Sequence, residues 1–138
     1  MSQTPASQQT LTYALLINAA PYGNVQAMHA YQFAAAALES GHQISQVFFY
    51  QEGVAHASGL NLPANDEFNL TKAWQQLAAE HNIRLEVCVA ASLRRGVVDD
   101  NEAKRHQVDG HNLAAGFEMA GLGGLAQSML TQDRLVQF

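Results

Sequence analysis

The sequence predicts a single α/β domain with three layers, in which a mostly parallel sheet of about five strands carries helices on both faces. Three observations support this prediction. Short, nearly continuous apolar runs alternate with longer segments of helical periodicity, which is typical of a parallel sheet. The chain has 138 residues, enough for one domain with a sizeable core. Apolar residues make up 48% of it, so a packed globule is expected rather than disorder.

The first part of the chain predicts two strands with a helix between them. Residues 13–18 (YALLIN) form an apolar run typical of a strand that is buried on both faces. A turn with proline and glycine follows, and Asn24 can cap a helix over residues 25–40. Gly41 stands where a left-handed residue would end that helix. The second strand is expected over residues 43–50 (QISQVFFY).

The middle of the chain predicts the clearest helix. Residues 51–65 are expected to form a loop with about one helical turn. After them, five apolar residues recur at helical spacing and form one stripe: Leu70, Ala73, Trp74, Leu77 and Ala78. Asn65 or Asp66 is expected to cap this helix. The third strand is expected over residues 83–89 (IRLEVCV).

The last third predicts two helices and a final strand. A short helix over residues 90–95 follows the third strand, and the polar stretch 99–110 should be exposed. A longer helix is expected over residues 112–131, perturbed near GLGG at 121–124. This glycine motif lacks the lysine and Ser/Thr of a phosphate-binding loop, and no strand is expected before it, so close helix packing or a kink explains it better. The final strand is expected over residues 134–138 (RLVQF).

Charge and cysteine content narrow the possible classes of protein. A formal charge of −5 and a pI near 5.6 argue against direct binding of nucleic acid. A single cysteine excludes an internal disulfide and favours a reducing compartment. The N-terminus has neither the basic residues nor the apolar core of a signal peptide, and the apolar run after it is too short to cross a membrane. We therefore expect a cytoplasmic protein without membrane association, with residues 1–11 as a flexible extension and residues 12–138 as the domain.

The single cysteine, Cys88, is the leading candidate for a functional residue. It stands near the end of the third expected strand, where the chain turns into a helix. Ligands and reactive groups of parallel sheets lie outside the carboxyl ends of the strands. Unpaired N–H groups at a helix start would stabilise the thiolate, which is the nucleophilic form. A buried, inert cysteine is the alternative, because free cysteine often behaves as a small core residue. Arg95 starts roughly 10 Å from Cys88 along the helix axis, so the helix start is a better candidate activator than Arg94 or Arg95, which are expected to complement the C-terminal end of that helix or to face a partner.

Other candidate sites are weaker. Six histidines are scattered without ligand spacing, and His106 and His111 are five residues apart, so we expect no metal site and no cofactor. The acidic residues Asp99, Asp100 and Glu102 are typical of a solvated surface. A cysteine hydrolase would need a histidine beside Cys88, which the sequence alone cannot place.

Four separated blocks of the sequence carry a resemblance to a known family: PYGNVQAMHAYQFAAAALESGH, SQVFFYQEGV, VCVAASLRRGV and GLGGLAQSMLTQDRLVQF. In this order and spacing they resemble the sulfurtransferase subunits of the DsrE-like (DsrE/TusD) family, over residues 13–138. The resemblance implies a DsrE-like fold. It also implies that Cys88 is the catalytic residue and carries a persulfide intermediate.

The resemblance further implies a sulfur relay for this chain. Sulfur would pass from a TusA-like donor to Cys88 and then to a TusE-like acceptor, for 2-thiolation of the wobble uridine of certain tRNAs. Contact with tRNA would be indirect. TusB-like and TusC-like subunits would complete a dimer of heterotrimers. Two alternatives within the same fold remain open, a DsrE-type relay of sulfur oxidation and a non-catalytic assembly subunit.

Overall fold

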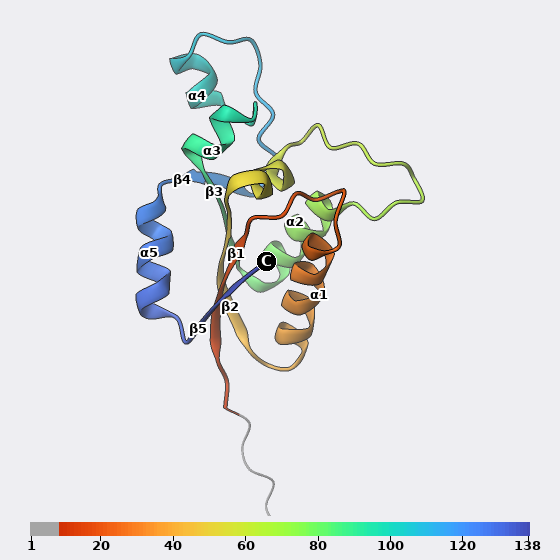
Figure 1. Cartoon of the computed structure of the whole chain (residues 1–138), viewed down its shortest axis with the longest axis vertical. Helices are drawn as coiled ribbons and strands as arrows, with labels where there is room; N and C mark the ends of the chain where they lie inside the picture. Colours follow the sequence, from red (N-terminus) through yellow and green to blue (C-terminus); the bar gives the residue numbers. More distant parts are fainter. Residues whose placement is uncertain (1–8) are drawn as a thin grey trace, which may run out of the picture.

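The protein forms one five-stranded, fully parallel sheet with the strand order β4-β3-β2-β1-β5 (Figure 1). The computed structural model describes residues 9–138. The strands are β1 (Thr12–Ile17), β2 (Gln43–Phe49), β3 (Arg84–Cys88), β4 (Phe117–Ala120) and β5 (Arg134–Gln137). The helices are α1 (Gln26–Glu39), η1 (Gln51–Ala57), α2 (Leu70–His81), α3 (Val89–Arg94), α4 (Asp100–Arg105) and α5 (Leu122–Thr131).

The path of the chain explains why both faces of the sheet are covered. From β1 to β4 each strand lies beside the one before it, and α1 and α2 pack on one face. The chain then returns from β4 at one edge to β5 at the opposite edge, and this crossover carries α5 over the other face (Figure 1). The predicted three-layer α/β fold is confirmed.

The core lies mainly between the sheet and the α1–α2 face. Phe49 of β2 contacts Trp74 of α2 with ring centroids 5.8 Å apart, and it contacts Phe117 of β4 at 5.5 Å. Tyr31 of α1 also contacts Trp74, with ring centroids 5.4 Å apart. Trp74 is fully buried, so the apolar stripe predicted around it does face the core.

The face under α5 is more polar. Gln46 of β2 is fully buried, and its side-chain oxygen accepts a hydrogen bond from the hydroxyl of Ser128 on α5. Glu86 of β3 is also buried and pairs with Arg84 at 3.3 Å. Gly124 of α5 lies directly over this group, because a Cβ there would stand 3.4 Å from the Glu86 carboxylate. This is an ordinary contact distance, so α5 packs against the polar side chains at this point.

The prediction of one helix over residues 112–131 is wrong. Phe117–Ala120 pairs with β3 as strand β4, and the helix begins only at Leu122. The segment FEMA consists largely of good helix formers, so its local propensity misled the prediction, and pairing with β3 overrides that propensity. Gly116, at φ +88°, provides the left-handed backbone that leads into the strand.

Two smaller predictions are also corrected. Asn69 caps α2 by accepting a hydrogen bond from the backbone N–H of Lys72, so neither Asn65 nor Asp66 is the cap. The polar stretch 99–110 is not exposed throughout, because it folds into α4 and buries Glu102. A short amphipathic turn inside a polar segment gives too few apolar positions to be recognised from spacing.

The predicted boundaries of α1 are close to those observed. The N-cap residue is Val25, however, and not the predicted Asn24, and no side chain caps the helix start. The side chain of Asn24 instead accepts a hydrogen bond from the backbone N–H of Gln26 at 3.0 Å. Gly41 follows the helix with φ +91°, as expected. Of the predicted flexible extension, residues 1–8 lie outside the described residues. Leu11 is tied to the start of β2, because its carbonyl accepts from the N–H of Gln43 at 2.9 Å. Within residues 9–138, no helix is long and apolar enough to cross a membrane.

Candidate functional site

Cys88 occupies the junction between a strand and a helix. It is the last residue of β3, and it is also the N-cap residue of α3, which begins at Val89. Its extended backbone, with φ −62° and ψ 124°, is the usual conformation of an N-cap. The predicted position of the thiol at the carboxyl edge of the sheet, beside a helix start, is therefore confirmed.

The thiol is nearly enclosed. The cysteine is 5% exposed and belongs to the main apolar core, together with Ala91 of α3 and Leu125 of α5. It is free of any disulfide. Because so little of the residue is exposed, a partner protein can reach the sulfur only after the segments around it move.

The glycine motif at 121–124 lies close to Cys88, which the sequence did not predict. Cys88 is paired in register with Ala120, the last residue of β4, and α5 starts directly after it with Gly121 as the N-cap. No side chain caps this helix start, and nothing lies within 4 Å of the position of a Cβ on Gly121 or Gly123. The motif does follow a strand, contrary to the sequence-based expectation.

The two arginines after Cys88 have different surroundings. Arg95 forms a two-pronged contact with the Glu52 carboxylate of η1, from Nε at 2.9 Å and from the second terminal nitrogen at 2.8 Å. It also donates to the carbonyl of Ala91 at 3.1 Å. Arg95 therefore ties α3 to η1. The side chain of Arg94 is exposed.

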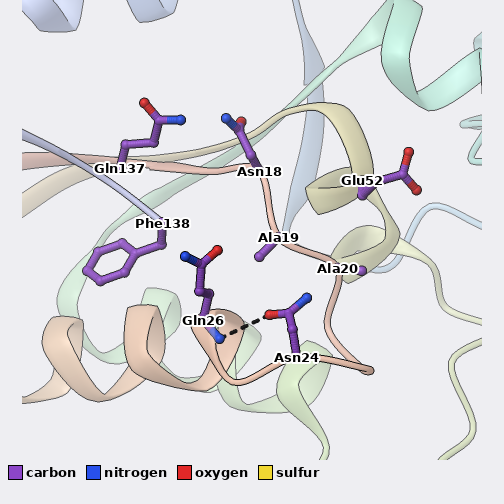
Figure 2. A pocket seen from close by; sticks show the side chains of 8 residues that line it. All are labelled: Asn18, Ala19, Ala20, Asn24, Gln26, Glu52, Gln137 and Phe138. Carbon is purple, nitrogen blue, oxygen red and sulfur yellow. Dashed lines mark hydrogen bonds between the residues drawn. The ribbon is translucent and has the colours of Figure 1, made fainter.

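A separate hollow of about 530 Å³ lies at the carboxyl ends of β1 and β5. Figure 2 shows Asn18 and Gln137 from the strand ends on one side, and Asn24 and Gln26 from the start of α1 on the other, with Glu52 at the far end. Sequence analysis missed this group, because Asn18 and Gln137 meet only when the last strand pairs with the first. Their positions directly after β1 and at the end of β5 are the one signal that could have identified them.

The other candidates from the sequence do not converge on Cys88. His106 lies 3.4 Å from the Glu102 carboxylate, and His111 lies 3.8 Å from Asp100, both around α4. Asp99 caps α4 by accepting from the N–H of Glu102 at 2.8 Å. Within the part of the chain that the structure describes, no group of three or more His, Cys, Asp or Glu side chains is arranged to hold a metal ion.

The most deeply buried histidine was not singled out from the sequence. His56 of η1 is fully buried, and one ring nitrogen lies 3.1 Å from the carbonyl of Ala19. Burial lowers the pKa of this histidine to about 4, against a smaller raising effect of the Ala19 carbonyl. The ring is therefore neutral at pH 7 and donates to that carbonyl, which fixes η1 against the end of β1.

Comparison with known proteins places the chain in a family. The DsrE/DsrF-like family model matches residues 12–138. The "Sulfurtransferase TusD homolog" of Vibrio vulnificus is 62% identical over 129 residues, which cover 94% of this chain and 98% of that protein. The "Sulfurtransferase TusD" of Proteus mirabilis is 59% identical, with 93% and 98% covered, and that of Klebsiella pneumoniae is 51% identical, with 93% and 100% covered.

A solved structure supports the same fold. The crystal structure of the ychN protein from E. coli superimposes with a TM-score of 0.73 at 21% sequence identity, and covers 94% of this chain and 100% of that one. The resemblance that was noted from the four sequence blocks is confirmed. The chain belongs to the DsrE/DsrF-like family and is a sulfurtransferase.

Proposed function

We propose that this sulfurtransferase carries sulfur as a persulfide on Cys88. The observation behind the proposal is the place of the single cysteine, at the carboxyl end of β3 and at the start of α3. The first N–H groups of α3 have no partner within the helix, and none of them donates to the Cys88 side chain in this structure. Cys88 is the only group in the chain that can carry sulfur covalently, since the sequence has no second cysteine.

The proposed chemistry consists of two exchanges of one sulfur atom. The Cys88 thiolate attacks the outer sulfur of a donor persulfide, a new S–S bond forms on Cys88, and the donor leaves as a thiolate. The thiolate of an acceptor protein then attacks the outer sulfur on Cys88, and Cys88 leaves as a thiolate. One S–S bond forms and one breaks in each step, so no external oxidant or reductant is needed. The absence of a second cysteine in the chain prevents loss of the sulfur to an internal disulfide.

We propose the partners that the family resemblance implies. A TusA-like protein supplies the sulfur, a TusE-like protein accepts it, and the sulfur ends in the 2-thiouridine of tRNA in the cytoplasm. TusB-like and TusC-like subunits complete the assembly. Relatives that are 51–62% identical to this chain carry the name "Sulfurtransferase TusD" or "Sulfurtransferase TusD homolog". Their names support this choice over a sulfur-oxidation relay. The acidic net charge of −5 is consistent with contact to tRNA only through another protein.

The enclosure of Cys88 has a consequence for this function. A persulfide adds one sulfur atom at a residue that is 5% exposed, so the loaded form must displace neighbouring atoms. The segment with Gly121 and Gly123 is exposed and has free space around it. We propose that this segment yields when the sulfur is loaded.

The test is transfer of labelled sulfur to and from the purified protein. Wild type, incubated with a persulfidated TusA-like donor, should gain one labelled sulfur per chain, and a TusE-like protein should remove it. Cys88→Ser should gain none, because a serine hydroxyl is a far poorer nucleophile at neutral pH. Thermal unfolding of the variant serves as the control for folding. Label on the serine variant would exclude Cys88 as the carrier, and wild type that takes up no sulfur would exclude the relay.

A further inference from the structure

The side chain of Cys88 lies on the face of the sheet that α5 covers. Successive residues of a strand point to opposite faces, so Cys88 points to the same face as Glu86, two residues before it on β3. Gly124 of α5 lies over that face, since a Cβ there would stand 3.4 Å from the Glu86 carboxylate. α5 starts directly after β4, at the edge of the sheet where β3 ends, and runs from there back to the start of β5 (Figure 1). The first turn of α5 is therefore the part of the helix that lies nearest to the thiol.

The start of α5 is held more weakly than its end. Of the ten residues of the helix, only Leu125 and Ser128 are buried. The described residues provide no side-chain cap for its start, and the glycines at 123–124 weaken its first turn, because glycine is less favourable than alanine within a helix. The end is fixed to the sheet, since the Asp133 carboxylate accepts from the N–H of Thr12 at 2.8 Å, and the N–H of Asp133 donates to the Thr12 hydroxyl at 3.1 Å. α5 therefore leaves the sheet most easily from the end beside the thiol.

The polar surface under α5 gains hydrogen bonds when the helix leaves it. The side-chain oxygen of Gln46 accepts from the Ser128 hydroxyl, but its side-chain nitrogen is buried and has no hydrogen-bond partner in the described part of the chain. α5 lies over that nitrogen, because a Cβ on Gly124 would stand 3.8 Å from it. A buried N–H group without a partner costs free energy, and water removes this cost once the helix has lifted. The cost opposes the stabilisation that burial of Leu125 gives to the closed helix.

The other helix beside the thiol has a side-chain tie that the start of α5 lacks. Arg95, at the end of α3, contacts the Glu52 carboxylate of η1 at 2.8 Å. Arg95 also donates to the carbonyl of Ala91 at 3.1 Å, which fixes its side chain along α3. The segment that gives way for Cys88 is therefore α5 rather than α3.

We propose that α5 is a lid on Cys88, which unwinds from Gly121 as far as Ser128 and so uncovers the thiol. The hydrogen bond between Ser128 and Gln46 is the last contact to break, while Asp133 keeps the end of the helix on the sheet. The open lid provides the space that a persulfide needs and lets a partner protein reach the sulfur. The proposal rests on the relay function proposed above, and it names the element that controls access to the thiol.

Alkylation of Cys88 by iodoacetamide tests the lid without any transfer of sulfur. The full chain, purified with its accompanying subunits, is followed by its mass, since its single cysteine takes up only one label. Gly123→Ala strengthens the first turn at a position with open space around it, and it should slow alkylation about two- to fivefold. Ser128→Ala should speed alkylation at least about fivefold, because the closed helix loses its hydrogen bond to Gln46.

A second substitution and a control variant identify the cause of these changes. Addition of Gln46→Met to Ser128→Ala should return the rate to that of wild type or below it, because the polar groups left without a partner under the helix are then gone. Gln127→Ala changes an exposed residue of the same helix and should alter the rate by less than about twofold. A double variant that reacts as fast as Ser128→Ala would contradict the role of the buried amide.

Urea separates opening of the lid from unfolding of the whole chain. Local opening exposes little surface, so the alkylation rate of wild type should rise with urea much less steeply than the equilibrium constant of global unfolding does. A rate that rises with the full slope of global unfolding would mean that Cys88 is reached only in the unfolded chain, and it would overturn the lid.

The outcomes distinguish the lid from the relay. Absence of either expected change, in Gly123→Ala or in Ser128→Ala, overturns the lid, while the relay stands as long as wild type takes up labelled sulfur from its donor. Wild type that takes up no sulfur refutes the relay, and the alkylation rates still decide whether α5 covers the thiol. If Ser128→Ala does not fold, Gly123→Ala decides alone, because its exposed position leaves the core intact.

Discussion

His56 is buried in its neutral form, and this makes the free energy of unfolding depend on pH. A single substitution of His56 can test this dependence. The ring is fully buried, with its centroid 5.1 Å from that of Phe49. Its pKa is lowered by burial from an ordinary 6.5 to about 4. The unfolded chain therefore binds a proton at a pH where the folded chain does not. The contribution of His56 to the free energy of unfolding is fully present above pH 6.5, and it is lost as the pH falls from 6.5 toward 4.

The size of the effect follows from these two pKa values. Each pKa unit corresponds to about 1.4 kcal/mol, so a difference of roughly 2.5 gives about 3 kcal/mol when the pH is well below 4. Between pH 7.5 and 4.5 the expected loss is about 2.5 kcal/mol, because the folded state begins to protonate only near the lower limit. This loss is a sizeable fraction of a typical total stability of about 5–15 kcal/mol.

The assay is urea unfolding of wild type and His56→Gln at the two pH values. Glutamine keeps an N–H that can donate to the Ala19 carbonyl, but it does not titrate. The pKa values of Asp100 and Asp133 are lowered by hydrogen bonds from Lys104 and from the backbone of Thr12, and their titration cancels in the comparison. Wild type should lose about 2.5 kcal/mol more than the variant. Equal losses would refute the reasoning, since they would mean that the folded state protonates His56 as readily as the unfolded chain does.

Two further predictions concern the fold. Gly53→Ala should destabilise the protein by at least about 2 kcal/mol in urea unfolding, because the added Cβ would clash with the backbone carbonyl of Ile17. Gly123→Ala, where space is open, is the control and should have no such cost. Equal effects of the two substitutions would contradict the close approach of η1 to β1. Asn69→Ala should lower the free energy of unfolding by about 1 kcal/mol, because α2 loses its N-cap, whereas Asn65→Ala should change it little. A larger loss for Asn65→Ala than for Asn69→Ala would show that Asn65, the cap predicted from the sequence, is the true one.

The sequence predicted those parts of the fold that depend on local pattern. The stripe around Trp74 extends over more than two turns of helix, and the run that ends at Cys88 is bounded by a clear change of periodicity, so both were placed correctly. β4 was missed because a four-residue strand of helix formers takes its structure from β3. The neighbours of Cys88 were missed for the same reason, since Gly121 comes beside the thiol only through the pairing of Cys88 with Ala120.

Sheet order also decides where chemistry can occur in this protein. β5 is the last strand in the sequence, yet it lies beside the first, and this single pairing creates the hollow that Asn18 and Gln137 share. The same sheet order leaves Cys88 two strands away from β1, at the same carboxyl edge. The thiol is enclosed among apolar residues, whereas the hollow is open and rich in hydrogen-bonding groups. The structure places these two environments at separate points along one edge of the sheet, so a substitution of Gln137 in the hollow should leave the surroundings of Cys88 intact.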